Sequence, residues 1–475
     1  MLFERFTDDD LSQYSYAVGC RAAGTMAIVD PRRDVDVYLD FSEDEGMEIT
    51  HVLETHVHAD FASGARELAE LTGAEVAVSG YDEGEAFEVA FPHRDLREGD
   101  AIELGSVRIE ALHTPGHTPE HLSFLVFDRT RSEKVPLLAL TGDFLFVGSL
   151  GRPDLLGEEA TRGLAERLFA SVREKLAGLP DGLEVHPAHG AGSMCGSGMS
   201  GRPRSTLGFE RIANPYLDPG LSRDELVEKI LDSSPPFPPY YRRMKRINAD
   251  GPAILGALPG LEPVAVGRFR ELVEGGEAVV VDLRDQHAFG GAHVPGAFGI
   301  GAHGKLSTWA AWVVPYERPI LLVPEHEGQV EDAVRSLVRV GLDDVVGYLD
   351  GGIASWRKEG LPLDEIPQVG PRELAARREE GEEIVVLDVR TDGEWASGHV
   401  EGAVHVMGGR LAEEDGDAEL DGRLGDGETP VAVVCGAGYR STVAASVLAR
   451  RGFDEVWNVT GGMTAWKAAD LPTVR

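Results

Sequence analysis

The feature that most constrains the fold of this chain is an internal repeat in its C-terminal half. The run VVVDLRDQHAFGGAHVPGA begins at Val279, and the similar run VVLDVRTDGEWASGHVEGA begins at Val385. A second pair of matching runs follows, GGIASWRKEGLP in the first copy and GGMTAWKAADLP in the second. The repeat therefore predicts two copies of one domain, which we place at residues 261–365 and 366–475.

Each copy alternates short β-branched runs, such as EEIVVLDV, with helix-like stretches, such as STVAASVLARRG. This alternation is typical of an α/β domain with a parallel sheet. Residues 1–211 differ, because strand-like runs such as ITHVLET and LSFLVF are separated by turns and only a few helical stretches. They predict an α/β domain built on sheets with helices outside. The proline-rich stretch 212–260 is predicted to be a linker that packs against its neighbours.

Length, charge and cysteine content restrict the function classes. A chain of 475 residues is too long for one core, and we expect about three domains. The formal net charge of −36 disfavours nucleic acid and anionic membranes as partners, and an anionic substrate would need a locally basic pocket. We find no membrane-spanning run, no secretory signal and no disulfide framework among three cysteines, so we expect a cytoplasmic protein.

Histidines and aspartates recur after successive strand-like runs in residues 1–211. The first group, THVHAD, places His56, His58 and Asp60 on alternate positions. The groups HTPGHTPEH, TGD and HPAHG follow in that order. Ligands at the end of a buried strand are held rigidly by the sheet, as a metal site requires. One such histidine alone would more readily be structural, but together they predict a metal site.

These four motifs, in this order, resemble the metal-binding loops of the metallo-β-lactamase superfamily. The resemblance covers roughly residues 10–210 and implies an αββα sandwich with the metal at one edge. The chain departs from the two-metal members at Phe61, where they carry a histidine that helps to hold the second metal. Because a phenyl ring cannot bind a metal, the sequence predicts one metal per chain.

Within this superfamily the persulfide dioxygenases use one iron. The resemblance implies that His56, His117 and Asp143 bind one Fe(II) per chain. Two imidazoles and one carboxylate leave positions open for a persulfide and O2, whereas zinc could activate water but not O2. The side chains that would orient the ligands or the substrate are His58, Asp60 and His189.

The second candidate site lies in the last domain, in VAVVCGAGYRSTVAASVLARRG. Cys435 ends a strand-like run and Ser441 begins a helix, so the N–H groups of the loop and the helix dipole favour a thiolate. Arg440 adds positive charge, and Gly436 and Gly438 let the backbone approach a bound anion. With LDVR, GHVEGA and GGMTAW, this loop resembles the active loop of rhodanese sulfurtransferases, which implies catalytic roles for the cysteine and the arginine. The four residues between these two suit a sulfur atom, whereas related phosphatase loops have five.

The first copy of the repeat lacks this loop. Alignment places Pro324 opposite Cys435 and Gln329 opposite Arg440. We therefore expect the middle domain to be a structural or docking module without sulfur transfer.

Three further side chains carry weaker signals. Arg152, in GRPDL, is a candidate to pair with a substrate carboxylate, because its planar fork suits bidentate pairing. Cys195 follows the HPAHG motif and is expected near the metal, where a sulfur-handling role and a structural role are both open. Cys20 lies in an apolar run and is expected to be packed inside.

Together the two sites predict one substrate class, a low-molecular-weight thiol persulfide, R–S–SH. O2 would oxidise its terminal sulfur to sulfite, and Cys435 would interconvert sulfite, persulfide and thiosulfate in either direction. The thiol could be glutathione, coenzyme A, cysteine or another, and a homo-oligomer is compatible with the sequence. The whole chain resembles fused persulfide dioxygenase–rhodanese proteins of sulfide detoxification.

Two other functions are weighed against this one. The first is a metal-dependent thioester hydrolase of the hydroxyacylglutathione hydrolase type with appended rhodanese domains. It usually needs two metals, so Phe61 counts against it. The second is a non-enzymatic sulfur carrier or scaffold with a vestigial metal domain, and the intact HVHAD, PGHT and TGD motifs count against it.

Overall fold

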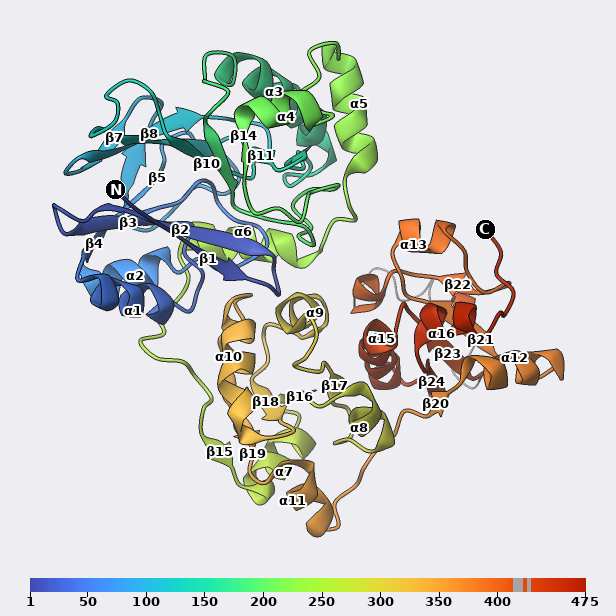
Figure 1. Cartoon of the computed structure of the whole chain (residues 1–475). Coiled ribbons are helices and arrows are strands. Elements are labelled where there is room, and N and C mark those ends of the chain that lie inside the picture. Colours follow the sequence, from blue (N-terminus) through green and yellow to red (C-terminus); the bar gives the residue numbers. More distant parts are fainter. Residues whose placement is uncertain (413–421, 425–428) are drawn as a thin grey trace. The chain divides into compact units, whose positions relative to one another are not determined.

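The computed structural model describes residues 1–412, 422–424 and 429–475 (Figure 1). The chain divides into two units, each with its own sheets. Unit 1 comprises Met1–Gly256 with Val338–Gly341, and unit 2 comprises Ala257–Leu337 with Leu342–Arg475. Among the described residues, no helix combines the length and the apolar composition that crossing a membrane requires.

The first sheet of unit 1 has six strands in the order β1-β2-β3-β4-β5-β6. The first three strands are antiparallel, and β3 to β6 run parallel. Helices α1 (Asp36–Glu45) and α2 (Ala65–Thr72) contribute buried side chains to the core on one face of this sheet. The strands are β1 (Leu2–Asp8), β2 (Gln13–Cys20), β3 (Thr25–Val29), β4 (Glu48–Leu53), β5 (Glu75–Ser79) and β6 (Arg94–Leu96).

The second sheet of unit 1 also has six strands, in the order β14-β13-β10-β9-β8-β7. A short hairpin and the helices α3 (Glu158–Lys175) and α4 (Leu207–Ala213) accompany it. The strands are β7 (Ala101–Leu104), β8 (Val107–His113), β9 (Leu122–Asp128), β10 (Leu138–Gly142), β13 (Glu184–Pro187) and β14 (Ser205–Thr206), and the hairpin consists of β11 (Leu145–Phe146) and β12 (Ser149–Leu150).

The central strand β9 explains why the second sheet is covered on both faces. Phe124 and Val126 lie in a core shared with strands of the first sheet, whereas Leu125 and Phe127 lie in a core shared with α3. Since successive side chains of a strand point to opposite faces, a strand with four apolar residues in a row must be covered on both faces. The two packed sheets with helices outside confirm the predicted αββα sandwich.

Unit 2 contains two five-stranded parallel sheets with the same topology, β15-β19-β18-β16-β17 and β20-β24-β23-β21-β22. This confirms the predicted parallel α/β domains. The first sheet has β15 (Pro263–Val264), β16 (Val279–Asp282), β17 (Phe298–Gly299), β18 (Ile320–Val323) and β19 (Val345–Leu349). The second has β20 (Gln368–Val369), β21 (Val385–Asp388), β22 (Val404–His405), β23 (Val431–Val434) and β24 (Val456–Val459).

Helices follow the strands in both copies, as the alternating pattern of the sequence predicts. The first copy has α7 (Val266–Glu274), α8 (Gln286–Gly291), α9 (Leu306–Val313), the short 3₁₀ helix η1 (Glu327–Gln329), α10 (Val330–Val338) and α11 (Gly352–Lys358). The second has α12 (Pro371–Glu379), α13 (Asp392–Ala396), η2 (Gly408–Ala412), α15 (Tyr439–Arg450) and α16 (Gly462–Ala468).

The D-x-R signature of the repeat has the same structural role in both copies. Arg284 pairs with Asp282 over 2.5 Å, and Arg390 pairs with Asp388 over 2.6 Å. Both carboxylates are fully buried at the end of a central strand. A buried charge is stable only when it is paired, so each arginine fixes the loop that follows its strand.

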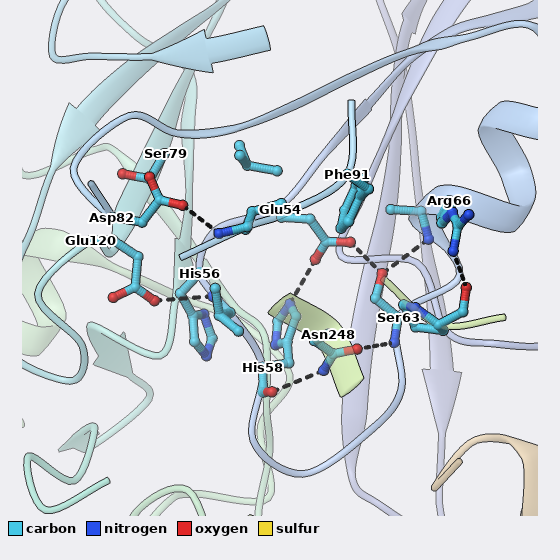
Figure 2. Close-up of a pocket in the computed structure, with 15 residues that line it drawn as sticks. Glu54, His56, His58, Ser63, Arg66, Ser79, Asp82, Phe91, Glu120 and Asn248 are labelled. Atoms are coloured by element: carbon cyan, nitrogen blue, oxygen red, sulfur yellow. Dashed lines mark hydrogen bonds and ion pairs between the residues drawn. The ribbon is translucent and has the colours of Figure 1, made fainter. Parts of the chain in front are cut away.

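The stretch 212–260, predicted as a linker, contains two helices, α5 (Arg223–Ser233) and α6 (Tyr240–Asp250). A capping box of Ser222 and Glu225 begins α5. Unit 1 extends to Gly256, and α6 directs Asn248 toward the loop that follows β4 (Figure 2). The residue boundaries of the domains stay predictions, but residues 212–256 of this stretch pack as part of unit 1.

Candidate metal centre and sulfur-transfer loop

The three predicted metal ligands come together at one edge of the sheets of unit 1. His56 lies just after β4, His117 in the loop between β8 and β9, and Asp143 directly after β10. Oδ2 of Asp143 lies 3.9 Å from Nε2 of His56 and 3.4 Å from Nε2 of His117. All three side chains are buried, and none of these three atoms has a hydrogen-bond partner among the described residues. Buried polar atoms are normally paired, so three unpaired atoms that face one another fit a metal ion.

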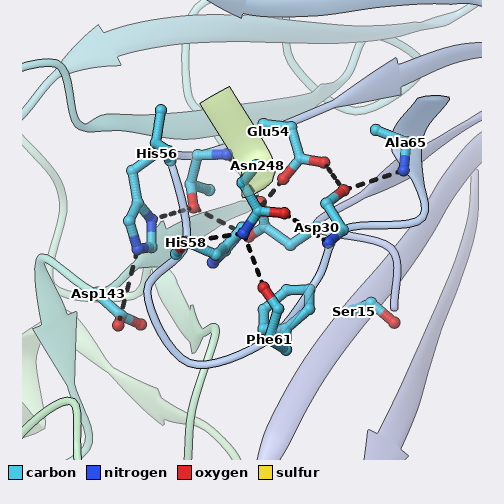
Figure 3. Close-up of polar contacts among 12 residues, drawn as sticks. Ser15, Asp30, Glu54, His56, His58, Phe61, Ala65, Asp143 and Asn248 are labelled. Atoms are coloured by element: carbon cyan, nitrogen blue, oxygen red, sulfur yellow. Dashed lines mark hydrogen bonds and ion pairs between the residues drawn. The ribbon is translucent and has the colours of Figure 1, made fainter. Parts of the chain in front are cut away.

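Hydrogen bonds on the far side of each imidazole leave Nε2 free for a metal. Nδ1 of His56 donates to the hydroxyl of Thr55 over 2.9 Å, and that hydroxyl donates to Asp30 over 3.0 Å (Figure 3). Nδ1 of His117 donates to the carbonyl of Arg152 over 2.8 Å. Burial lowers the pKa of both histidines well below the ordinary value, so both are neutral and able to bind a metal. The donor set suits a divalent ion such as Fe(II).

A third buried histidine bridges two carboxylates beside this group. Nδ1 of His189 lies 2.7 Å from Oδ1 of Asp143, and its Nε2 lies 2.7 Å from Oδ2 of Asp60. Although burial lowers it, these two carboxylates raise the pKa of His189 well above the ordinary value. Nδ1 of His189 is hydrogen-bonded to Asp143, whereas its Nε2 and Oδ2 of Asp60 form an ion pair without a hydrogen bond among the described residues. Phe61, its ring centroid 6.5 Å from that of His189, offers no metal ligand here.

His58 belongs to a separate buried cluster. Its Nε2 lies 3.1 Å from Asp30 and 3.0 Å from Glu54 (Figure 3). Although burial lowers it, Asp30 and Glu54 raise the pKa of His58 to about 10. Asp30 in turn accepts the backbone N–H of Thr55 over 2.7 Å. His58 thus acts on His56 indirectly, by ordering the groups that hold it.

The predicted thiol, Cys435, ends β23 ahead of helix α15 and is 1 % exposed. Its sulfur accepts the N–H of Gly438 over 3.1 Å and the hydroxyl of Ser441 over 3.3 Å. Gly438 has a φ of 111°, which residues with a side chain rarely adopt. The guanidinium of Arg440 forms two bonds of 2.7 Å with Glu394 and is held beside the loop.

Two further features define this loop. A Cβ at Gly436 would lie 3.0 Å from Nη2 of Arg440, so a side chain there would press on the guanidinium. The hydrogen bonds from Arg440 lower the pKa of Glu394 to about 2, and the pair is charged at neutral pH. The structure therefore brings together all the residues that the sequence assigned to this site.

Two family models match the chain. The metallo-β-lactamase superfamily matches residues 8–189, and the rhodanese-like domain matches residues 265–359 and 370–469. Persulfide dioxygenase ETHE1 of Bos taurus is 30% identical over 46% of this chain and 76% of its own length. The chain belongs to the metallo-β-lactamase superfamily. Its metallo-β-lactamase domain has persulfide dioxygenase homologues and precedes two rhodanese-like domains, which confirms the fused organisation expected from the sequence.

Two other relatives add to this assignment. A metallo-β-lactamase from Staphylococcus aureus, compared through its crystal structure, is 34% identical in sequence to this chain. The match covers 73% of this chain and 98% of that chain, with a TM-score of 0.67. Hydroxyacylglutathione hydrolase GloC of Haemophilus influenzae is 29% identical over 40% of this chain and 87% of its own length. The metallo-β-lactamase domain is thus related to oxygenases and to hydrolases.

The first rhodanese-like domain carries no thiol where the second has Cys435. Pro324 follows β18 there, and Gln329 ends η1. The side-chain oxygen of Gln329 accepts the N–H of His326 over 3.1 Å, so this residue is bonded within its own loop. The role of this domain stays a prediction.

The backbone carbonyl of Arg152 is part of the surroundings of the metal centre, because it accepts the hydrogen bond from Nδ1 of His117. Its guanidinium forms bonds of 2.6 and 2.7 Å with Asp154 and donates to the carbonyl of Met194 over 3.0 Å. The side chain of Arg152 is buried, and both arms of its guanidinium are already bonded to Asp154. A substrate carboxylate would have to displace Asp154 before it could pair with Arg152 as the sequence suggested.

Cys195 lies beside the metal centre, as expected. Its sulfur lies within 4.8 Å of ligand atoms of Asp60 and His189 and 3.7 Å from the hydroxyl of Tyr241. Burial raises the pKa of the Cys195 thiol well above the ordinary value, so it is protonated. Cys20 is buried, in the predicted manner, next to Ser106.

Sequence reasoning gave no role to several residues that shape the metallo-β-lactamase site. Nε2 of His121 accepts the backbone N–H of Asp143 over 3.0 Å and so positions a predicted ligand. Asp30 follows the run GTMAIV, and its place at the end of a strand-like run was a usable signal. Lys245 and Asn248 lie far along the chain from every motif, and nothing in the sequence pattern connects them to the site.

Proposed function

We propose that the chain is a mononuclear iron persulfide dioxygenase coupled to a rhodanese-type sulfurtransferase. One observation carries the proposal: among the residues that the structure describes, a donor set of two histidines and one carboxylate occurs in the same chain as the Cys435 loop. A persulfide is a substrate for both kinds of chemistry. The similarity to persulfide dioxygenase ETHE1 supports the first activity, and the two rhodanese matches support the second.

His56, His117 and Asp143 would hold one Fe(II). A bound ferrous ion supplies the O2-dependent redox chemistry that zinc lacks. The oxidation balances as R–S–SH + O2 + H2O giving R–SH + SO3²⁻ + 2 H⁺. His189 donates to Oδ1 of Asp143, which leaves Oδ2 turned toward the two imidazoles. The buried surroundings exclude bulk water from the donor atoms.

The Cys435 loop would transfer the outer sulfur of a persulfide. The sulfur of Cys435 attacks the outer sulfur of R–S–SH, the S–S bond breaks, and R–S⁻ leaves. Sulfite then attacks the outer sulfur of the Cys435 persulfide, that S–S bond breaks, and the electron pair stays on the sulfur of Cys435 as thiosulfate forms. The N–H of Gly438 and the hydroxyl of Ser441 stabilise the thiolate that is left. The reverse reaction also balances: thiosulfate gives its outer sulfur to Cys435, which passes it to R–SH and supplies the dioxygenase.

A second candidate function is thioester hydrolysis, because hydroxyacylglutathione hydrolase GloC matches the same domain. This reaction releases a thiol from a thioester and consumes no O2. The two candidates therefore differ in a direct measurement of O2 uptake with a persulfide against thiol release from a thioester. The carrier is identified in the same assay by comparing glutathione, coenzyme A and cysteine persulfides. The proposed setting is the cytoplasm, where three free thiols stay reduced.

The first prediction concerns the metal. Purified protein should contain about one iron per chain, and His117→Ala should lose the iron and O2 uptake, because one of three donors is gone. Sulfur transfer from thiosulfate should persist, since Cys435 lies in another domain. Metal analysis and an oxygen electrode provide the measurements. Two tightly bound zinc ions in the active protein would contradict the proposal.

A further inference from the structure

Helix α6 packs against the metal centre although it lies outside residues 8–189, which the superfamily model matches. Its composition is basic, yet Tyr241, Lys245 and Asn248 are 1 %, 1 % and 7 % exposed. Burying a lysine and an amide costs free energy unless their polar groups are bonded. Their partners therefore reveal what this helix does.

Asn248 holds the loop that carries the THVHAD motif. Its amide nitrogen donates to the carbonyls of His58 and Phe61 over 2.9 and 2.7 Å (Figures 2 and 3). Its amide oxygen accepts the N–H of Ser63 over 2.8 Å. One side chain thus satisfies three backbone groups of a buried irregular loop that has no strand partner for them.

Lys245 holds the same loop at Val57, next to the predicted metal ligand His56. Its ammonium donates to the carbonyl of Val57, the residue after His56, over 2.9 Å. The N–H of Val57 donates to Glu120 over 3.1 Å, and Glu120 lies 3.9 Å from the ammonium. Glu120 belongs to the loop that carries His117, so Lys245 and Glu120 together connect the loops of two predicted ligands.

We propose that α6 is a positioning element of the metal centre, in which Lys245 and Asn248 fix the His56 loop against the His117 loop. Neither Lys245 nor Asn248 is one of the three predicted metal ligands. Both act through the backbone carbonyl and N–H groups that they bind in the His56 loop. The inference rests on the metal site proposed above. It makes the segment after the metallo-β-lactamase match a required part of that site.

The test compares two substitutions with a matched control in the full chain. Lys245→Met keeps the stem and removes the ammonium. Asn248→Asp keeps the acceptor for Ser63 and replaces the two donated hydrogen bonds by charge repulsion. Arg246→Met removes an exposed cation from the same helix, with a side chain that is 61 % exposed. The probe is Co(II), whose visible absorption reports the geometry of its ligands.

We expect both test variants to bind Co(II) about 10- to 100-fold more weakly than the wild type and to show altered visible bands. Arg246→Met should match the wild type in both. Unchanged affinity and spectrum in both test variants would overturn the inference, and so would a loss of affinity with an unchanged spectrum, since that indicates a general loss of stability. Circular dichroism and the urea unfolding midpoint of the metal-free full chain check that unit 1, which contains both substituted residues, is folded in each variant. A wild type that binds no Co(II) or iron would instead refute the metal site itself.

Discussion

Cys435 illustrates how much of the chemistry rests on a few atoms. Its sulfur has two donors, one from the backbone of Gly438 and one from Ser441, and the charge of Arg440 is nearby. Sulfur in this place can accept sulfane sulfur and can leave again when sulfite removes it. A hydroxyl in the same place would have neither property.

Cys435→Ser should therefore separate the two activities. The variant should consume O2 with a pre-made persulfide at the wild-type rate and release sulfite in place of thiosulfate. Ion chromatography of the products measures this. In the wild type, mass spectrometry after exposure to thiosulfate should find one added sulfur atom on Cys435. Enzymatic thiosulfate at the wild-type rate from the variant would require another thiol, and Cys195 would be the next to test.

The pair of Arg440 and Glu394 makes a small, pH-dependent contribution to stability. Because Arg440 lowers the pKa of Glu394 from 4.5 to about 2, the contribution is complete above pH 4.5 and is lost as the pH falls toward 2. The side chains are 25 % and 39 % exposed, so we expect Glu394→Gln to cost about 1 kcal/mol or less at pH 7. Urea unfolding followed by tryptophan fluorescence should show this difference at pH 7 and a smaller one at pH 3. A difference that does not shrink would mean that the charge of Glu394 is not responsible.

Among the elements, strands that carry motifs were predictable and the helix that supports them was not. The runs before His56, Asp143 and Cys435 are apolar and β-branched, so pattern alone placed these side chains at strand ends. Helix α6 is YYRRMKRINAD, which reads as a solvated basic stretch because Lys245 and Asn248 are polar. Burial of such residues is decided by partners distant in sequence, which composition does not encode.

The same limit applies to charge states within the site. The identity of residue 61 as phenylalanine predicts one metal per chain. The raised pKa of His189, in contrast, depends on the two carboxylates that the fold places 2.7 Å away on either side. Arg152 shows the reverse case. Its neighbour Asp154 was visible in GRPDL, yet only the structure shows that the two pair with each other.

The first rhodanese-like domain should be silent in sulfur transfer, because Pro324 and Gln329 replace the thiol and the arginine. We expect Cys435→Ala in the full chain to leave no thiosulfate-dependent sulfur transfer above background. The measurement is formation of persulfide on an added thiol, with His117→Ala as a control that retains the loop. Residual transfer by the cysteine variant would point first to Cys20 or Cys195, because residues 261–365 contain no cysteine. Transfer that persists after these two are also replaced would contradict the prediction.

For the whole molecule, the net charge of −36 should oppose the approach of sulfite and thiosulfate, the anionic substrates proposed above. A surface of one sign repels like-charged ions over about a Debye length, ~30 Å at 0.01 M salt and ~8 Å at physiological ionic strength. Raising the salt concentration should therefore increase kcat/KM for sulfite and thiosulfate several-fold while kcat changes little. Steady-state kinetics in sodium chloride measures this. A fall in kcat/KM would mean that positive charge around Cys435 governs the approach of the anion.

The bidentate pair of Glu394 and Arg440 also marks a difference between the two copies of the repeat. In the first copy the position of Glu394 is held by Ala288, and the position of Arg440 by Gln329, so both halves of the pair are missing together. The Asp–Arg pair at the strand end persists in both copies. If the first copy is silent in sulfur transfer, as predicted, comparison of the two copies separates the residues that this fold needs for stability from those that it needs for catalysis.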